Sequence, residues 1–489
     1  MRKIGLYMHN NHLKKSIYSG VFWQGLERIG SYGISFVVSI ILARKLSPEE
    51  FGVIAIMMVF ITLSNVFIDS GFSTALIQKK DMEQADCCSV FYINIVMSFV
   101  LYGILFLASP FIAELYKTEK LTLYLHVFSM ILIIRSFSLV QNALLRKRML
   151  FHLSFRISWI ALIISGIVGI SMAYSGYGVW ALIAQQMTNA LITVIMQWLW
   201  IKWRPQWIFD WKRTKELFNF GWKMFCSGFL DTLYNDIYSL VIGKIADLEM
   251  LSYYDRGKQY PQYGMNIINS MIGTVLLPAF SELQDDRKKM KELAVRGLKN
   301  IMFIVTPALA FLFAFADSIT ILLLTEKWLP SVIFIRLCCI TFLFFPFHTT
   351  NLQIITACGR SDVFLILEII KKVQGILVIA ITYRFGVVTM VAVGAAMGLV
   401  GMIENSWYNR KLIDYAPWQQ LRDNIPVAVI AILVSVISYF VTVPIHDIWL
   451  KLITGSFVFG ALYLVTTFFT HTFPQEIEQL IRKLVFRRA

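Results

Sequence analysis

The sequence consists almost entirely of apolar stretches that are long enough to cross a lipid bilayer. A membrane-spanning helix needs about 20 apolar residues, and about fourteen such stretches follow one another along the 489 residues with only short polar joints between them. They are continuous runs, without the alternation of apolar and polar residues that marks the strands of a transmembrane barrel. We therefore predict an all-α integral membrane protein with spans at 21–43, 51–70, 88–112, 121–143, 153–175, 178–201, 218–242, 251–280, 298–318, 330–356, 362–383, 386–407, 425–443 and 449–470.

A weak internal repeat divides these spans into two halves. The exit of the first span reads Ala43-Arg44-Lys45-Leu46-Ser47-Pro48-Glu49, and the exit of the seventh reads Gly243-Lys244-Ile245-Ala246-Asp247-Leu248-Glu249. The copies are six spans apart and therefore point the same way, as in transporters built from two parallel bundles; chance similarity between two apolar helices is the alternative. We expect two six-helix lobes around a central cleft, with an N-terminal segment at 1–20, an N-lobe at 21–201, a basic loop at 202–217, a C-lobe at 218–410, two appended spans within 424–470, and a basic tail at 471–489.

The net charge of +15 comes mainly from Lys and Arg in alternate joints and near both ends of the chain. Lys79 and Lys80, Arg146 to Arg148, and Arg487 and Arg488 are examples. Because positively charged loops stay on the cytoplasmic side, this distribution predicts a multi-pass membrane protein with both termini in the cytoplasm. The surplus charge is thus explained by topology and contact with anionic lipids, and we expect no nucleic-acid partner.

The motifs of several enzyme classes are missing. The sequence has no G-x-x-x-x-G-K-[ST] phosphate loop, no H-E-x-x-H or G-x-S-x-G motif, and no Cys/His spacing for a metal. Its longest polar segments are shorter than any soluble domain. We therefore expect a transporter without a cofactor or a metal, and not an enzyme.

Ionisable and polar residues inside the spans are the candidate site residues. A charged group at mid-bilayer costs about 2.5–3.5 kcal/mol, so such groups should face a cavity or pair with one another across helices. Arg and Lys suit a phosphate, Tyr and Gln suit sugars, and buried acids suit a coupling H⁺ or Na⁺. The candidates are Glu27 and Arg28 in the first span, Thr62, Asn65 and Asp69 in the second, Arg135, Ser138 and Asn142 in the fourth, Lys223, Asp231 and Tyr234 in the seventh, Arg256, Gln259, Tyr260 and Tyr263 in the eighth, and Glu368 in the eleventh.

Four segments of the chain resemble one known family. They are Leu42-Ala43-Arg44-Lys45-Leu46-Ser47-Pro48-Glu49-Glu50-Phe51-Gly52, Asp69-Ser70-Gly71-Phe72-Ser73-Thr74-Ala75-Leu76-Ile77-Gln78, Gly176-Tyr177-Gly178-Val179-Trp180-Ala181-Leu182, and Tyr253-Tyr254-Asp255-Arg256-Gly257 through Leu277-Pro278-Ala279-Phe280-Ser281. In this order they resemble Wzx-type, colanic-acid-exporter-like polysaccharide flippases of the multidrug/oligosaccharidyl-lipid/polysaccharide exporter superfamily. The resemblance covers nearly the whole chain.

The resemblance implies a flippase of the bacterial inner membrane that moves undecaprenyl-pyrophosphate-linked oligosaccharide units to the periplasmic leaflet by alternating access, and that works with a polysaccharide polymerase and chain-length proteins. In that picture Arg28, Arg135, Lys223 and Arg256 bind the diphosphate, and Tyr234, Gln259, Tyr260 and Tyr263 line the sugar path. Glu27, Asp231 and Glu368 are then the candidates for ion coupling. The alternatives are a drug/cation antiporter of the same superfamily, a flippase for the peptidoglycan precursor, and a membrane glycosyltransferase, ligase or assembly scaffold.

Overall fold

The computed structural model describes residues 25–470, 472 and 473, except for the side chains of 220, 267 and 269–275. The predicted N-terminal segment 1–20, the first four residues of the first span and nearly all of the basic tail lie outside this description. The described residues form helices and contain no strand, which confirms the predicted all-α class. By internal contacts the chain divides into two compact units, Met1–Ser252 (unit 1) and Tyr253–Ala489 (unit 2).

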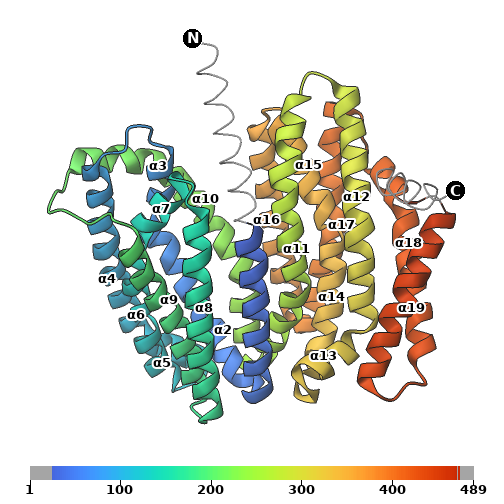
Figure 1. Cartoon of the computed structure of the whole chain (residues 1–489), viewed down its shortest axis with the longest axis horizontal. Coiled ribbons are helices and arrows are strands. Elements are labelled where there is room, and N and C mark those ends of the chain that lie inside the picture. Colours follow the sequence, from blue (N-terminus) through green and yellow to red (C-terminus); the bar gives the residue numbers. More distant parts are fainter. Residues whose placement is uncertain (1–24, 471, 474–489) are drawn as a thin grey trace. The chain divides into compact units, whose positions relative to one another are not determined.

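Unit 1 is a bundle of helices joined by short connections (Figure 1). Its helices are Gly25–Lys45, α2 (Pro48–Asp69), α3 (Phe72–Gln78), α4 (Gln84–Leu115), α5 (Leu121–Phe128), α6 (Met130–Ser136), α7 (Leu139–Lys147), α8 (Phe151–Tyr174), α9 (Val179–Trp200) and α10 (Trp211–Ile245). The next helix, α11 (Leu248–Glu282), begins in unit 1 and continues into unit 2.

Unit 2 is also helical. It contains α12 (Arg287–Ala314), α13 (Ala316–Leu324), the 3₁₀ turn η1 (Glu326–Ser331), α14 (Val332–Leu343), α15 (Phe345–Ala357), α16 (Ser361–Thr382), the 3₁₀ turn η2 (Tyr383–Phe385), α17 (Val387–Ile413), α18 (Pro417–Thr442) and α19 (Ile448–Phe469). A fully buried amide network joins three of these helices: the Asn351 side chain donates to Ser406 Oγ at 3.1 Å and to Gln420 Oε1 at 2.9 Å. Since such groups are costly to bury unpaired, the network favours one alignment of α15, α17 and α18.

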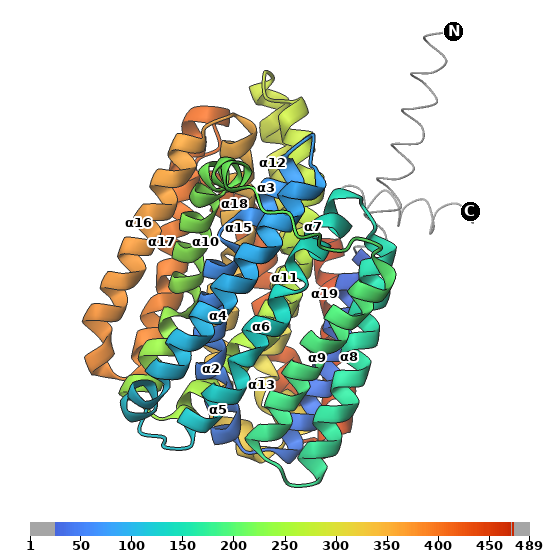
Figure 2. The ribbon, with the colours of Figure 1, turned by 90° about the vertical axis from the view of Figure 1, so that its left-hand side faces the viewer.

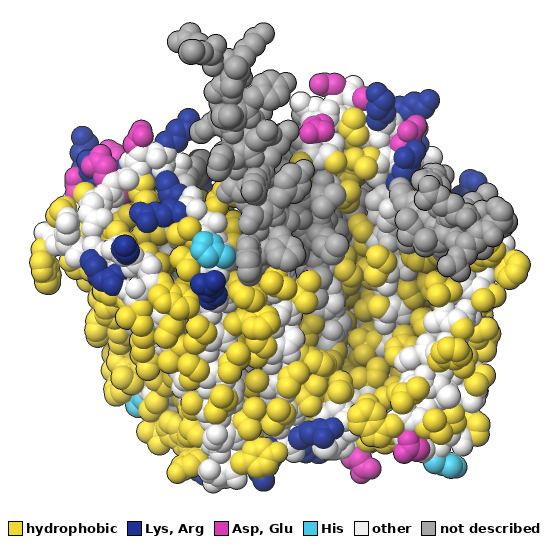
Figure 3. Space-filling model, in the orientation of Figure 1, with side chains coloured by type: hydrophobic (Ala, Val, Ile, Leu, Met, Phe, Trp, Pro, Cys, Tyr) yellow, Lys and Arg dark blue, Asp and Glu magenta, His cyan; other side chains and the backbone are white. Residues whose placement is uncertain are grey.

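The structure confirms a multi-pass membrane protein. In the described part of the chain, ten helices are long and apolar enough to cross a bilayer, and the bent pair Leu121–Ser136 and Leu139–Lys147 raises the number to eleven. Hydrophobic side chains cover the middle of the visible helices, and charged side chains gather near their ends (Figure 3). Others of the expected spans are helical but more polar; α16, for example, contains Glu368, Lys371 and Lys372. The count of fourteen therefore stays a prediction.

The short connection between the first helix and α2 is stabilised by hydrogen bonds among its own residues. Ser47 caps α2: its hydroxyl accepts from the Glu50 backbone N–H at 3.3 Å, while the Glu50 carboxylate accepts from the Ser47 N–H at 2.7 Å. Pro48 stands at the first helical position, where its missing N–H costs nothing. In the second copy of the repeat, Asp247 accepts from the Met250 N–H at 2.6 Å at the same place, so the two copies share a two-residue joint with a capped helix after it.

Helix α10 belongs to unit 1 because it packs along α2, α3 and α4. One close backbone approach joins Gly71, which has a positive φ of 75°, to Gly221: a Cβ on Gly71 would lie 2.2 Å from the Gly221 carbonyl oxygen. Phe67 of α2 packs edge-on against Phe225 and Phe229 of α10, with ring centroids 5.1 Å apart in both pairs. Unit 1 thus extends past the expected lobe boundary at 202–217, and the six-helix lobes themselves stay a prediction.

Candidate functional site: a polar pocket in unit 1

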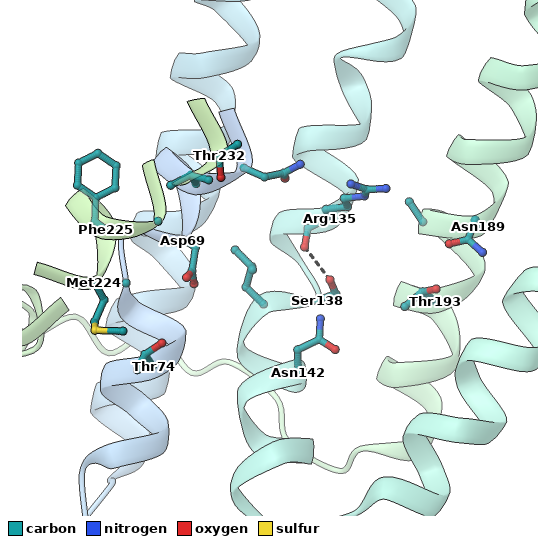
Figure 4. A pocket seen from close by; sticks show the side chains of 16 residues that line it. Asp69, Thr74, Arg135, Ser138, Asn142, Asn189, Thr193, Met224, Phe225 and Thr232 are labelled. Carbon is teal, nitrogen blue, oxygen red and sulfur yellow. Dashed lines mark hydrogen bonds between the residues drawn. The ribbon is translucent and has the colours of Figure 1, made fainter. Parts of the chain in front are cut away.

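A pocket of about 550 Å³ opens inside unit 1 among α2, α3, α6, α7, α9 and α10 (Figure 4). Apolar side chains such as Leu139 and Phe225 form part of its wall, but polar groups from all six helices converge on it. The polar lining residues are Asn65, Asp69, Thr74, Arg135, Ser138, Asn142, Asn189, Thr193 and Thr232. A mostly preformed cavity with a few convergent polar groups is typical of a ligand site.

Arg135 is the only basic residue that lines this pocket in the described part of the chain, and the break between α6 and α7 positions it. The Ser138 hydroxyl donates to the Arg135 carbonyl at 2.8 Å, and the two helix segments on either side of the break meet at 42° (Figure 4). Among the described residues, the Arg135 guanidinium has no hydrogen-bond or ion-pair partner. Because an unpaired cation at membrane depth is costly, Arg135 needs water or an anionic ligand.

Asp69 stands across the pocket from Arg135 but is already engaged. Its carboxylate accepts from the Ser73 backbone N–H at 3.1 Å and from the Ser73 hydroxyl, and so caps the start of α3. The intervening turn holds Ser70 and Gly71 at positive φ values of 43° and 75°. A carboxylate at a helix N-terminus is stabilised by the local N–H groups, which leaves Arg135 as the group available for an anion.

Two amides of the pocket are oriented by residues behind them. Asn142 accepts through Oδ1 from Gln197 at 2.8 Å, and Asn189 donates to Ser165 at 3.4 Å. These contacts orient two amide groups in the same pocket as Arg135. Such an arrangement of one cation, several amides and several hydroxyls suits a hydroxyl-rich anionic ligand.

The structure brings together five of the expected polar positions of the second and fourth spans and adds four polar lining residues that the sequence reasoning missed. Asn65, Asp69, Arg135, Ser138 and Asn142 all line the pocket. The missed residues are Thr74 of α3, Asn189 and Thr193 of α9, and Thr232 of α10. Asn189 and Thr193 could have been found, because polar residues four positions apart in an apolar span share one helix face.

The other candidates of unit 1 do not line this pocket. Glu27 accepts hydrogen bonds from Ser154 at 2.9 Å and Ser158 at 3.0 Å on α8, as in the helix-pairing alternative. Arg28, Lys223 and Asp231 are exposed, and Tyr234 is half-buried. A further acid of α10 faces α2, where Asp236 accepts from the Thr62 hydroxyl at 2.8 Å.

In unit 2, the candidates of α11 form a connected row. The Arg256 guanidinium donates to Gln259 Oε1 at 2.7 Å, and the Gln259 amide donates to the Tyr263 hydroxyl at 2.7 Å. Arg256 is buried and also lies over the Trp328 ring, 5.6 Å from its centroid, while Tyr260 packs against an apolar cluster. Glu368 accepts from Lys371 one turn along α16. Their roles in binding and coupling stay predictions.

No group of three or more His, Cys, Asp or Glu side chains that could hold a metal ion occurs in the described part of the chain. The pocket in unit 1 contributes a single acid, Asp69, which is engaged at α3. The cation, amides and hydroxyls that line the pocket can bind a ligand through charge and hydrogen bonds.

Comparisons with known proteins show which family this chain resembles. Residues 41–333, more than half of the chain, match the family described as polysaccharide biosynthesis protein. The succinoglycan biosynthesis transport protein ExoT of Rhizobium meliloti (strain 1021) is 24% identical over 314 residues, which are 64% of this chain and 64% of ExoT, so the match spans less than two thirds of that relative. The lipopolysaccharide biosynthesis protein WzxC of Escherichia coli (strain K12) is 22% identical over 354 residues, 72% of each chain.

The fold also matches a solved structure. The lipid II flippase MurJ, in its inward closed conformation, superposes with a TM-score of 0.69 at 15% identity over 91% of this chain and 98% of MurJ. This likeness confirms the transporter fold, and the sequence matches confirm the resemblance to polysaccharide flippases. The chain therefore belongs to the polysaccharide biosynthesis protein family.

Proposed function

We propose that this protein is a flippase that moves undecaprenyl-pyrophosphate-linked oligosaccharide repeat units across the bacterial cytoplasmic membrane for the assembly of surface polysaccharide. Membership of the polysaccharide biosynthesis family carries the proposal. The printed description of ExoT as a transport protein and the MurJ-like fold support it. The protein acts as a transporter, not as an enzyme, with both termini in the cytoplasm.

The pocket in unit 1 supplies binding chemistry that fits this cargo. Arg135 offers a fork of N–H donors to the anionic part of the head group, and the amides of Asn142 and Asn189 offer donors and acceptors to sugar hydroxyls. In unit 2, Arg256, Gln259 and Tyr263 form a second row of the same character. Arg28 and Lys223 add charge for the diphosphate, and Tyr234 and Tyr260 add ring faces for sugars. Alternating access then exposes the head group to one side of the membrane at a time.

The experiment that tests this function is mass spectrometry of the lipid fraction from a deletion strain, with surface polysaccharide measured in parallel. We expect full-length lipid-linked repeat units to accumulate on the cytoplasmic side while surface polysaccharide is lost. Normal lipid intermediates together with normal polysaccharide would exclude the flippase and favour drug or cation export. Complete units that still reach the periplasm, but with altered linkage or chain length, would indicate an enzyme or an assembly scaffold.

We further propose that an H⁺ or Na⁺ gradient drives transport and that Asp231 is the coupling acid. Asp231 is exposed on α10, one position before the pocket residue Thr232, so it lies beside the residues that are proposed to bind the head group. Asp231→Asn is expected to remove the dependence of transport on pH or sodium in proteoliposomes while the protein still inserts. Glu27→Gln, which keeps an acceptor oxygen for the serines, is the matched control. Unchanged ion dependence in Asp231→Asn would contradict the assignment.

A further inference from the structure

A second cavity in unit 1 is an open apolar groove of about 1060 Å³ on the outside of α4 and α10. We call it the aromatic groove and define it by Phe72, Tyr92, Val96, Trp207, Trp211 and Phe218. It is exposed: Trp207 is 96% accessible and Val96 is 60% accessible. Exposed aromatic side chains at the end of membrane helices are typical of the membrane interface.

One wall of the groove is a loop that is hydrogen-bonded to α4. The connection between α9 and α10 runs past the start of α4 (Figure 2), where the Tyr92 hydroxyl donates to the Gln206 carbonyl at 3.0 Å and Gln84 donates to the Arg204 carbonyl at 2.7 Å. The Asp210 N–H donates to the Ser89 hydroxyl at 2.9 Å. These bonds hold the loop against α4 and leave its Trp207 and Phe209 side chains exposed. The Trp207 ring stacks on the Tyr92 ring, with their centroids 5.7 Å apart.

One of the residues that line the groove is charged. Lys215 lines it and is exposed, and among the described residues its ammonium makes no ion pair. Its neighbour Arg213 is different, because it pairs with Glu83 at 2.9 Å and with Asp210 at 3.3 Å. The groove therefore combines an apolar surface with one lysine that makes no ion pair among the described residues. This combination is complementary to a lipid with an anionic head group.

The groove and the polar pocket lie on two sides of one turn. Asp69 and Gly71 line the pocket, whereas Ser70 and Phe72 line the groove. On α10, Phe218 lines the groove and Phe225 lines the pocket, and Gly221 between them makes the close backbone contact with Gly71. A molecule with an apolar chain and a polar head could thus have its chain on one side of this contact and its head on the other.

We propose that the aromatic groove binds the polyprenyl chain of the lipid-linked substrate as it docks from the membrane, with Lys215 on the diphosphate before the sugar head enters the pocket of Arg135. This proposal rests on the proposed function. The flat rings and Val96 give apolar contact to a methyl-branched chain, whose burial is favourable in proportion to the area covered. A phospholipid of the bilayer is the competing occupant, and the experiment must distinguish the two.

The test is photolabelling of the full-length protein in nanodiscs with a polyprenyl diphosphate that carries a diazirine in its chain and no sugar. We expect adducts on residues 92–97 and 207–218. Val96→Trp, which fills the groove, should reduce labelling at least about fivefold, and Val100→Trp, one turn along the same exposed face, should not. Lys215→Gln should reduce labelling by the diphosphate but not by the polyprenyl alcohol of the same chain length. Lys212→Gln, also exposed but outside the groove, should change neither.

Several outcomes would overturn the proposal. Equal labelling of Val96→Trp and Val100→Trp, or displacement of the probe by phosphatidylglycerol as readily as by unlabelled polyprenyl phosphate, would show an unselective lipid surface. Lys215→Gln keeps the test valid if Val96→Trp does not fold, because Lys215 is exposed. The proposed function is tested by a separate experiment. Normal lipid intermediates in a deletion strain would reject the flippase even if the photolabelling gave the expected result. Full export by Val96→Trp with unchanged labelling rejects only the groove.

Discussion

Arg135→Gln is expected to reduce export of lipid-linked units at least about tenfold without loss of the protein from the membrane. The guanidinium is the only cation in the unit 1 pocket and makes no hydrogen bond or ion pair with another described residue, so its removal should cost binding and not folding. A charge-assisted hydrogen bond contributes about 1.5–3 kcal/mol, and 1.4 kcal/mol corresponds to a factor of ten. The measurement is the amount of lipid-linked intermediate and of surface polysaccharide in a deletion strain that expresses the variant.

Two further variants make this result interpretable. Arg135→Lys keeps the charge but loses the planar fork, and an intermediate defect is expected if the ligand accepts two parallel hydrogen bonds. Arg146→Gln removes an exposed arginine of α7 that does not line the pocket, and export should stay normal. Wild-type polysaccharide with Arg135→Gln at a normal protein level would show that this pocket does not hold the anionic head.

Gly71→Ala is expected to destabilise unit 1 by about 3 kcal/mol or more, because two costs add at one position. The positive φ of 75° is unfavourable for any residue with a Cβ, and the new methyl group would lie 2.2 Å from the Gly221 carbonyl oxygen. Since this atom belongs to the backbone of α10, relief requires separating α10 from the α2–α3 turn. The measurement is the thermal unfolding of the purified protein, together with its yield.

Gly176→Ala is the matched control for this prediction. Gly176 has a similar φ of 80°, but a Cβ there would meet nothing within 4 Å. It therefore carries the backbone cost alone, about 1–2 kcal/mol. If both variants unfolded at the same temperature, the contact between Gly71 and Gly221 would have no part in holding α10 against α2.

Part of the pocket was predictable from the sequence because polar residues in an apolar span stand out individually. Asp69, Arg135 and Asn142 were recognisable in this way, and all three line the pocket. Asn189 and Thr193 were missed, although their spacing of four residues places them on one face of α9. Glu27 was recognisable too, yet it serves as an acceptor for two serines of α8, since a polar residue in a membrane helix is satisfied as well by a neighbouring helix as by a cavity.

The sequence by itself determined the all-α membrane class, the capped joints at Ser47 and Asp247, and the set of polar side chains that must find partners inside the membrane. These properties depend on hydrophobicity and on contacts between residues close in the chain. Only the tertiary structure decided that α10 packs against α2 through Gly71 and Gly221, and that Arg135 shares a pocket with residues of α9. Helix pairing in a membrane depends on the close fit of surfaces from distant parts of the chain, because apolar character alone attracts a helix equally to lipid and to every other helix.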